Sequence, residues 1–193
     1  MAERPLRADA ARNRQRVLDA ARAAFAEAGP GVPLDEIAAR AGVGPGTVYR
    51  HFPSKEALFA AVAEARVRDV VAEAHERATH PDPAAAFDGF LDRLAAEAVA
   101  KRDLPEVLSG AGSPEVLVAA ADLRAALAVL LTRAQDAGAV RTDVTAAEVT
   151  ALVRGLILAS LDDPDPGLAV RLLQIVREGL ATRPPGGDRS RGR

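Results

Sequence analysis

The stretch GVGPGTVYRHFPSKEAL at residues 42–58 gathers side chains that could bind a phosphate or the edge of a nucleic-acid base. Tyr49, the single tyrosine of the chain, and His51 can donate hydrogen bonds to phosphate oxygens. Arg50 between them can bind a phosphate or the edge of a guanine. Lys55 follows where the next helix is expected to begin, so its charge and the free backbone N–H groups there could hold one phosphate together. This grouping of donors indicates a surface that contacts nucleic acid.

The elements expected to position these groups are two short helices joined by a glycine turn, over residues 34–52. Ala38 is small where the two helices must cross closely, and Gly42 lets the backbone turn sharply. Val48 and Phe52 are expected to point inward and anchor the second helix. This is a helix-turn-helix pattern. It leaves a set of outward candidates for DNA contact, namely Pro45, Gly46, Thr47, Tyr49, Arg50, His51 and Lys55.

A longer segment around this pattern matches a known family. The residues that carry the match are RVLDAARAAFAEAG and LDEIAARAGVGPGTVYRHFPSKEALFAAV, and the run G-V-x-x-G-T-[LV]-Y-x-[HY]-F-x-[SN]-K-x-x-L is its most specific part. From about Arg12 to Ala63, the chain resembles the DNA-binding domain of the TetR family of transcriptional regulators. The resemblance implies a homodimer that places each recognition helix in the major groove of a palindromic operator, with half-sites about one helical turn or a multiple apart. It also implies a helical C-terminal domain that binds a small effector and dimerises through its last two helices.

The resemblance also assigns roles to single positions. Common phosphate or base contacts of the family fall here at Thr47, Tyr49, His51 and Lys55. Pro45 and Arg50 fall at variable positions that often set the choice of sequence. Pro33 departs from the family pattern, because it stands where a Ser or Thr often caps the helix and touches a phosphate, and its ring cannot donate a hydrogen bond.

Composition favours a helical globular protein. Of the 193 residues, 49% are hydrophobic and 27% are charged, and alanine, the best helix former, is abundant. The chain has no cysteine, which excludes a disulfide framework and thiolate chemistry. It has no apolar run of about 18 residues and no apolar segment behind its basic start, so we expect neither a membrane span nor a secretory signal. These features together predict a cytoplasmic protein.

Charge is unevenly distributed along the chain. The net charge is −2, but residues 1–60 carry nine Lys or Arg against seven Asp or Glu, whereas residues 61–193 carry sixteen against twenty. Five of the arginines lie within the first sixteen residues. They are either solvated surface or a basic arm near DNA, whose contribution would fade with salt.

Helix signals predict an all-α fold of about nine helices. A first helix is expected over 9–28, short helices over 33–42 and 45–51, and a long helix capped by Ser54 that ends near 78. Asp82 with Pro83, Ser113 with Pro114, and Thr145 with Glu148 (a capping box) predict the next starts, and a last helix is expected over 167–181. We divide the chain into a basic flexible arm (1–11), a three-helix DNA-binding domain (12–60), a ligand-binding and dimerisation domain (61–182) and a disordered tail (183–193).

Two sets of residues in the C-terminal part are candidates for binding. If an effector pocket exists, its apolar lining is expected from Phe87, Phe90, Leu94, Leu123, Leu127 and Leu130. Small residues recur at positions i, i+4 and i+8 in TALVRGLILAS, and a mid-helix glycine costs about 1 kcal/mol relative to alanine, so a closely approaching helix is expected there. The predicted dimer interface, a four-helix bundle across a two-fold axis, comprises Ala151, Leu152, Gly155, Leu156, Ala159, Leu168, Leu172, Leu173, Val176 and Leu180.

Other functions find less support in the sequence. His51 could ligate a metal, but His75 and His80 are the other histidines and neither has ligand spacing, so no metal or other cofactor is expected. The glycine-rich GPGTVY and SGAGS lack the G-K-[ST] ending of a phosphate loop. A helical enzyme is the remaining alternative, but no nucleophile–base pair stands out in the sequence to support it. The alternatives are therefore a repressor released by an unknown small molecule, and a DNA-binding activator or architectural protein without an effector.

Overall fold

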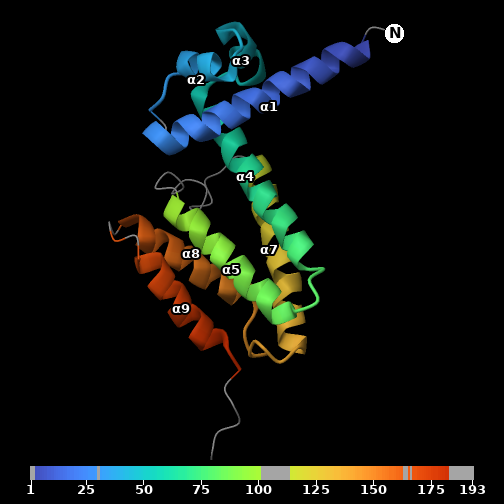
Figure 1. Ribbon diagram of the computed structural model, residues 1–193, viewed down its shortest axis with the longest axis vertical. Coiled ribbons are helices and arrows are strands. Elements are labelled where there is room, and N and C mark those ends of the chain that lie inside the picture. Colours follow the sequence, from blue (N-terminus) through green and yellow to red (C-terminus); the bar gives the residue numbers. More distant parts are fainter. Residues whose placement is uncertain (1–2, 30, 101–113, 163–164, 166, 183–193) are drawn as a thin grey trace, which may run out of the picture. The chain divides into compact units, whose positions relative to one another are not determined.

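The computed structural model describes residues 3–29, 31–100, 114–162, 165 and 167–182. Within them lie eight α-helices, shown in Figure 1, and no strand, so the all-α prediction is confirmed. The helices are α1 (Glu3–Ala28), α2 (Leu34–Ala41), α3 (Pro45–His51), α4 (Lys55–Arg77), α5 (Pro83–Ala100), α7 (Pro114–Asp136), α8 (Ala146–Asp162) and α9 (Leu168–Leu180). Residues 101–113 and the tail predicted over 183–193 lie outside the described residues.

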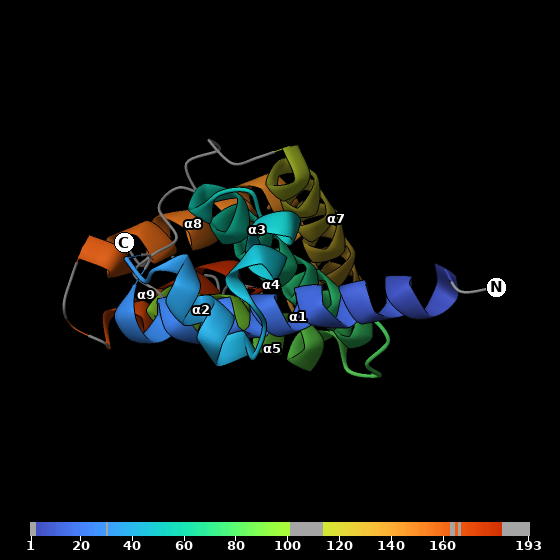
Figure 2. The same cartoon turned by 90° about the horizontal axis from the view of Figure 1, so that it is seen from above.

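The first compact unit has its own core, built by α1, α2, α3 and the beginning of α4. In Figure 2, α2 and α3 lie beside α1, and α1 contacts both. Ile37 of α2, Val48 of α3 and Leu58 of α4 are each fully buried in this core. Phe25 and Phe59 meet in it with their ring centroids 5.7 Å apart. Burial of these side chains fixes α3 against α1 and α2.

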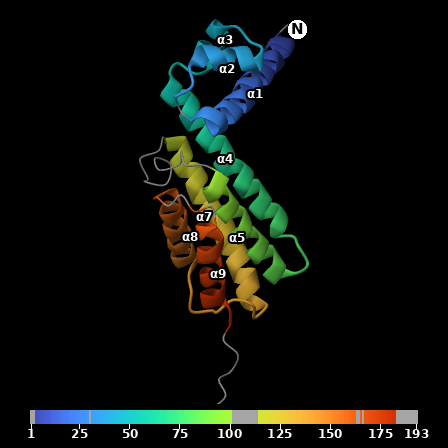
Figure 3. The ribbon, with the colours of Figure 1, turned by 60° about the vertical axis from the view of Figure 1, so that its left-hand side comes forward.

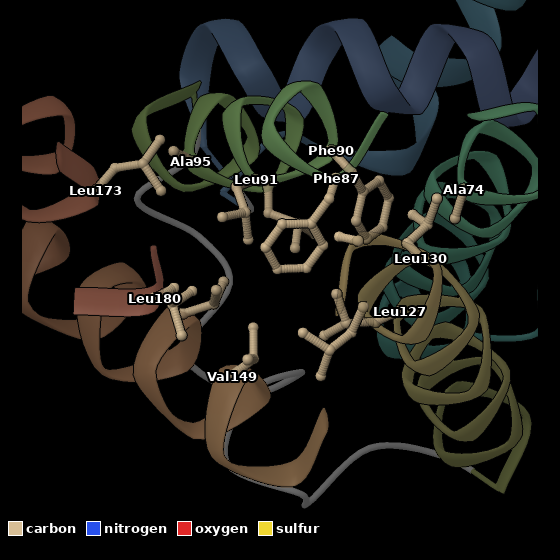
Figure 4. Close-up of a cluster of buried hydrophobic side chains, with 14 of the residues drawn as sticks. Ala74, Phe87, Phe90, Leu91, Ala95, Leu127, Leu130, Val149, Leu173 and Leu180 are labelled. Atoms are coloured by element: carbon tan, nitrogen blue, oxygen red, sulfur yellow. The ribbon is translucent and has the colours of Figure 1, made fainter. Parts of the chain in front are cut away.

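The second unit contains the larger core, built by α5, α7, α8, α9 and the later part of α4. Figure 3 shows α5, α7, α8 and α9 running alongside one another as a bundle. In Figure 4, Phe87 and Phe90 of α5 project from that helix toward Leu127 of α7. Leu173 and Leu180 of α9 close the same cluster. Apolar packing across these helices holds the unit together.

Three helix starts follow the predicted capping chemistry. The Ala57 N–H donates to Ser54 Oγ at 3.1 Å, and the Ala85 N–H donates to Asp82 Oδ1 at 3.0 Å. The capping box before α8 is formed, because the Thr145 N–H donates to Glu148 Oε2 at 2.7 Å and the Glu148 N–H donates to Thr145 Oγ1 at 3.3 Å. Each bond satisfies a backbone N–H that has no partner within the helix.

Two helix starts differ from the predictions. Helix α1 begins at Glu3 and not near Asp9, so residues 3–11 are helical. Alanine and arginine are good helix formers, and the sequence between Asp9 and Glu3 holds no strong stop signal besides Pro5, which is tolerated in a first turn. Pro33 is the N-cap of α2 and not its first helical residue, with φ −66° and ψ 147°, and its side chain makes no capping bond.

Helix α9 is tied to other segments of its unit at both ends. At its start, the Gly167 N–H donates to Asp165 Oδ1 at 2.8 Å, and Arg171 pairs with the same carboxylate at 2.7 Å. At its end, Val140 and Ala181 form an antiparallel bridge, and the Arg141 N–H donates to the Leu180 carbonyl at 2.9 Å. None of the described helices has the length and apolar character needed to cross a membrane.

Candidate nucleic-acid interface

The turn between α2 and α3 is set by one left-handed glycine. Gly42 has φ +62° and ψ 38°, a conformation that a residue with a side chain adopts only under strain. The Gly42 N–H donates to the Ala39 carbonyl at 3.1 Å, and the Val43 N–H donates to the Ala38 carbonyl at 3.0 Å. These bonds end α2 and turn the chain into α3. Both the glycine turn and its place between two helices agree with the sequence prediction.

Two arginines attach this turn and α2 to α1. Arg16 of α1 donates from a guanidinium nitrogen to the Gly42 carbonyl at 3.1 Å. Arg40 of α2 pairs with Glu27 of α1 at 2.5 Å and with Glu36 of its own helix at 2.7 Å. The hydrogen bonds that Arg40 donates to these two carboxylates, that to Glu27 first, raise the pKa of its guanidinium. The contacts of Arg16 with Gly42 and of Arg40 with Glu27 join residues 26 and 13 positions apart, so no local pattern in the sequence indicates them.

Helix α3 has one buried and one exposed side. Val48 is 0% exposed and Phe52, its C-cap residue, is 2% exposed, which confirms the prediction that they anchor the helix. Tyr49 is 50% exposed, and Arg50 is exposed beside it. Thr47 and His51 are partly exposed, and Pro45 and Gly46 are exposed at the start of the helix. The donors of the predicted contact set are therefore accessible on a short, rigidly mounted helix.

Lys55 lies at the first position of α4, directly after the Ser54 cap. It is partly exposed. Glu56 is the neighbouring acidic side chain, and bonds from its own backbone N–H and from Ser54 lower the pKa of its carboxyl. The backbone N–H groups of a helix start favour an anion, and Lys55 adds a positive charge at the same place.

The candidate effector residues are packed as core. Phe87, Phe90, Leu94, Leu127 and Leu130 are buried in the larger core, and Leu123 packs against it. Five of the six are therefore closed to solvent by side chains of α5, α7, α8 and α9, and a ligand there would have to separate them.

The candidate dimer residues fall into two groups. Leu156, Leu173 and Leu180 are buried within their own chain, and Leu172 and Val176 pack against the same core, so these five serve the fold of the protomer. Leu168 is partly exposed. The outward candidates are Ala151, Leu152, Gly155 and Ala159, all of them exposed. Together with Leu158, which is also exposed but was not predicted, they are called here the α8 apolar face. A Cβ placed on Gly155 would meet no atom within 4 Å, so none of the described residues of the protomer makes the close approach expected of this glycine.

No set of three His, Asp or Glu side chains in the described part of the chain could hold a metal ion. The chemistry of the accessible α3 surface is hydrogen-bond donation and positive charge. That chemistry fits phosphate oxygens and base edges.

Two family models match the chain. Residues 17–62 match "Bacterial regulatory proteins, tetR family", and residues 82–182 match "Transcriptional regulator SbtR-like, C-terminal domain". No curated protein matches the chain.

Solved structures resemble the chain over most of its length. One is a TetR transcription regulatory protein from Mycobacterium vanbaalenii, with 43% identity and a TM-score of 0.71, and the match covers 92% of this chain and 100% of that one. Another is a TetR transcriptional regulator from Streptomyces coelicolor, with 32% identity and a TM-score of 0.69 over 87% of this chain and 98% of that one. A TetR transcription regulator from Haloarcula marismortui is 20% identical with a TM-score of 0.69, over 88% and 98% of the two chains, and shares the fold.

Proposed function

This chain belongs to the TetR family of transcriptional regulators, and we propose that it represses transcription as a homodimer on a palindromic operator, until a small molecule releases it. The DNA-binding part is residues 12–60, and the effector and the partner protomer bind within residues 61–182. The observation that carries the proposal is that α3 is packed against the first core on one side and exposed on the other. Its inner side is buried through Val48 and Phe52, while Tyr49, Arg50 and the start of α4 present donors and positive charge outward.

The division of labour on this surface follows from the chemistry of each side chain. Arg50, exposed on α3, reads a base edge, since arginine binds the O6 and N7 of guanine in a bidentate way. Pro45 and Gly46, exposed at the start of α3, allow the backbone to come close to the groove. The phosphate backbone is bound by Thr47, Tyr49, His51 and Lys55, and these contacts fix the register of the protein on the duplex.

The DNA-binding proposal is tested with duplexes that the purified protein selects from a random pool. Arg50→Ala is expected to relax the preference at one base pair of each half-site by about 1–3 kcal/mol. Lys55→Met is the matched comparison, and it is expected to weaken binding to all sequences alike and to lower the salt slope by about 1 per protomer. Selection of no sequence, or binding that does not weaken with salt, would contradict the proposal.

The homodimer is proposed to form through the α8 apolar face. Leu152 is 47% exposed, and Leu158 on the same helix is also exposed, which is unfavourable unless another apolar surface covers them. The side chains at three positions of this face are small or absent, so a second helix can come close; these positions are Ala151, Gly155 and Ala159. The proposed interface therefore consists of the α8 apolar face. Compared with the interface predicted from the sequence, it adds Leu158 and omits the five side chains that pack into the protomer's own core.

The substitution Gly155→Leu separates the dimer from the protomer fold. The site is open among the described residues, so the larger side chain does not collide with that part of the protomer. At a helix–helix contact it would hold the partner helix away. We expect sedimentation to show a shift toward monomer with an unchanged helical spectrum. A full dimer would place the contact elsewhere.

Effector release is proposed to act through the core of α5 and α7. A ligand that binds between these helices must separate Phe87 and Phe90 from Leu127, and it shifts the protein between two states only if it prefers one of them. A thermal-shift screen of small apolar molecules, followed by operator binding with each hit, tests this. Hits that stabilise the protein but leave operator affinity unchanged would favour a regulator that does not respond to an effector.

A further inference from the structure

We infer that Arg14 of α1 binds a DNA phosphate beside the recognition helix, and so adds a contact from α1 to those of α3 and α4. The inference rests on the proposed DNA binding and extends it to a residue that lies within the proposed DNA-binding part but precedes residues 17–62, which the family model matches. Three observations carry it, namely the position of the guanidinium, its lack of a carboxylate partner, and the contrast with the arginines on either side.

The position of Arg14 is set by Phe52. Its guanidinium carbon lies 5.2 Å from the centroid of the Phe52 ring, within the range of a cation–π contact. Phe52 is the C-cap residue of α3, and its ring centroid lies 6.3 Å from that of His51. Arg14 therefore lies against the end of the recognition helix, next to a side chain already proposed to bind phosphate.

The stacked guanidinium keeps its donors available. An aromatic ring attracts a guanidinium through its face but accepts none of its in-plane hydrogen bonds, so the N–H groups of Arg14 remain able to bind an oxyanion. Within the described residues, Arg14 has no carboxylate in ion-pair distance, and its side chain is exposed. Holding the side chain on the ring also reduces the conformational entropy that phosphate binding would cost.

The neighbouring arginines of α1 are used differently. Arg12 pairs with Asp9 one turn earlier on the same helix. Arg16 donates to the Gly42 carbonyl and holds the turn. Of these three basic side chains, Arg14 is the one that combines a fixed place beside α3 with free hydrogen-bond donors, so it is the one suited to a phosphate.

The test compares Arg14→Met, Arg14→Lys and Arg12→Met in the full chain. Methionine keeps an apolar stem over Phe52 and removes the charge, and lysine restores the charge without the planar donors. Arg12→Met changes the net charge by the same amount two residues away, so it controls for a general loss of positive charge. The probe is a duplex selected by the unsubstituted protein. Fluorescence anisotropy measures the affinity of each variant for this duplex at salt concentrations from about 50 to about 300 mM, a range over which the loss of a phosphate contact changes the salt dependence of binding.

Arg14→Met is expected to lower the slope of log K against log salt by about 0.9 per protomer, which is roughly an eightfold loss of affinity per protomer at 0.1 M salt. Arg14→Lys is expected to keep the slope, and Arg12→Met to leave it unchanged. The inference is overturned if Arg14→Met keeps the slope, whether or not affinity falls, because the residue would then act through Phe52. It is also overturned if Arg12→Met lowers the slope equally. If the unsubstituted protein binds no duplex in a salt-dependent way, the proposed function fails together with this inference.

Discussion

The outward surface of residues 8–68 differs in kind from that of α8 and α9, although both regions are helical and pack on apolar cores. In the described residues from 8 to 68, Tyr49 is the one large hydrophobic side chain that is exposed, and its hydroxyl makes it a hydrogen-bond donor. On α8 and α9, by contrast, Leu152, Leu158, Val170 and Ile175 are all exposed, and Ile175 is 64% exposed.

The contrast indicates what each surface binds. A surface of donors and positive charge gains from a polyanion, because counterions are released and charged hydrogen bonds form. An apolar surface gains from covering by another apolar surface, which removes it from water. The difference supports the proposed contact with DNA through α3 and the proposed contact between protomers through α8, and the following substitutions test both proposals.

The largest effect is expected at the α8 apolar face. Leu152→Glu would place a charge in each of two symmetry-related positions, at a penalty of roughly 2 kcal/mol or more for each copy, so dimerisation should weaken about a thousandfold. Analytical ultracentrifugation over a concentration series measures this. Val129→Glu is the matched control, because Val129 is 50% exposed on α7 and outside the proposed contact. Equal dissociation of both variants would show that the interface is not confined to the α8 face.

A core substitution in each unit is expected to have a large but local effect. Phe90→Ala in the second core should lower the free energy of unfolding by about 3–5 kcal/mol, and Ile37→Ala in the first core by about 2–5 kcal/mol. Native-state hydrogen exchange should show lost protection in α5 and α7 for the first variant, and in α2 and α3 for the second. Loss of protection in both units with either substitution would mean that they unfold together.

Two left-handed glycines offer a smaller and sharper comparison. Gly42 in the first unit has φ +62°, and Gly138 in the second has φ +72°. A Cβ at Gly42 would lie 2.6 Å from a guanidinium nitrogen of Arg16, whereas one at Gly138 meets no atom within 4 Å. Both Gly→Ala changes should cost about 1–2 kcal/mol from backbone strain, measured by urea unfolding.

Only Gly42→Ala should also weaken DNA binding, because the alanine displaces Arg16 from the turn carbonyl before α3. Anisotropy with a selected duplex distinguishes the two variants. If both bind DNA like the unsubstituted protein, the Arg16 contact does not position α3.

The smallest expected effect is on the stability of the protein at acidic pH. The backbone N–H of Thr145, and then its hydroxyl, lower the pKa of Glu148 from its ordinary value of 4.5. A carboxyl whose pKa is lowered in the folded state contributes stability above about pH 4.5, and this contribution is lost as the pH falls through the lower, folded-state value. Glu148→Gln removes this titrating group, so the melting temperature of the variant should fall less than that of the unsubstituted protein as the pH is lowered below 4.5. Thermal melts over a pH series measure this. Glu56→Gln is the counterpart in the first unit, where the lowered pKa of Glu56 predicts the same sign.

The features that could be predicted from the sequence are those set by neighbouring residues. The caps at Ser54, Asp82 and Thr145 depend on residues three positions apart, and the turn at Gly42 depends on one backbone conformation. The inward positions Val48 and Phe52 follow from helix periodicity together with the family motif.

The features that sequence reasoning missed depend on which side of an apolar helix faces its own chain. On α8, both the buried Leu156 and the exposed Leu152 belong to apolar stripes, and periodicity does not say which stripe meets α9 and which meets solvent. The same ambiguity applies to Leu173 and Leu180, which are predicted at the dimer interface and are buried in the core of the protomer. The contacts of Arg14 and Arg16 join α1 to residues 26 or more positions further along the chain, where local pattern carries no signal.

The attachment of α9 at its far end decides how the protein can be handled. Its last ties are the Val140–Ala181 bridge and the bond from Thr182 Oγ1 to the Gly138 carbonyl. A shortened chain ending at Thr182 keeps both, whereas one ending at Gly179 loses them together with the buried Leu180. Purification tags and fluorescent labels therefore belong after Thr182, where they leave both ties and the buried Leu180 intact.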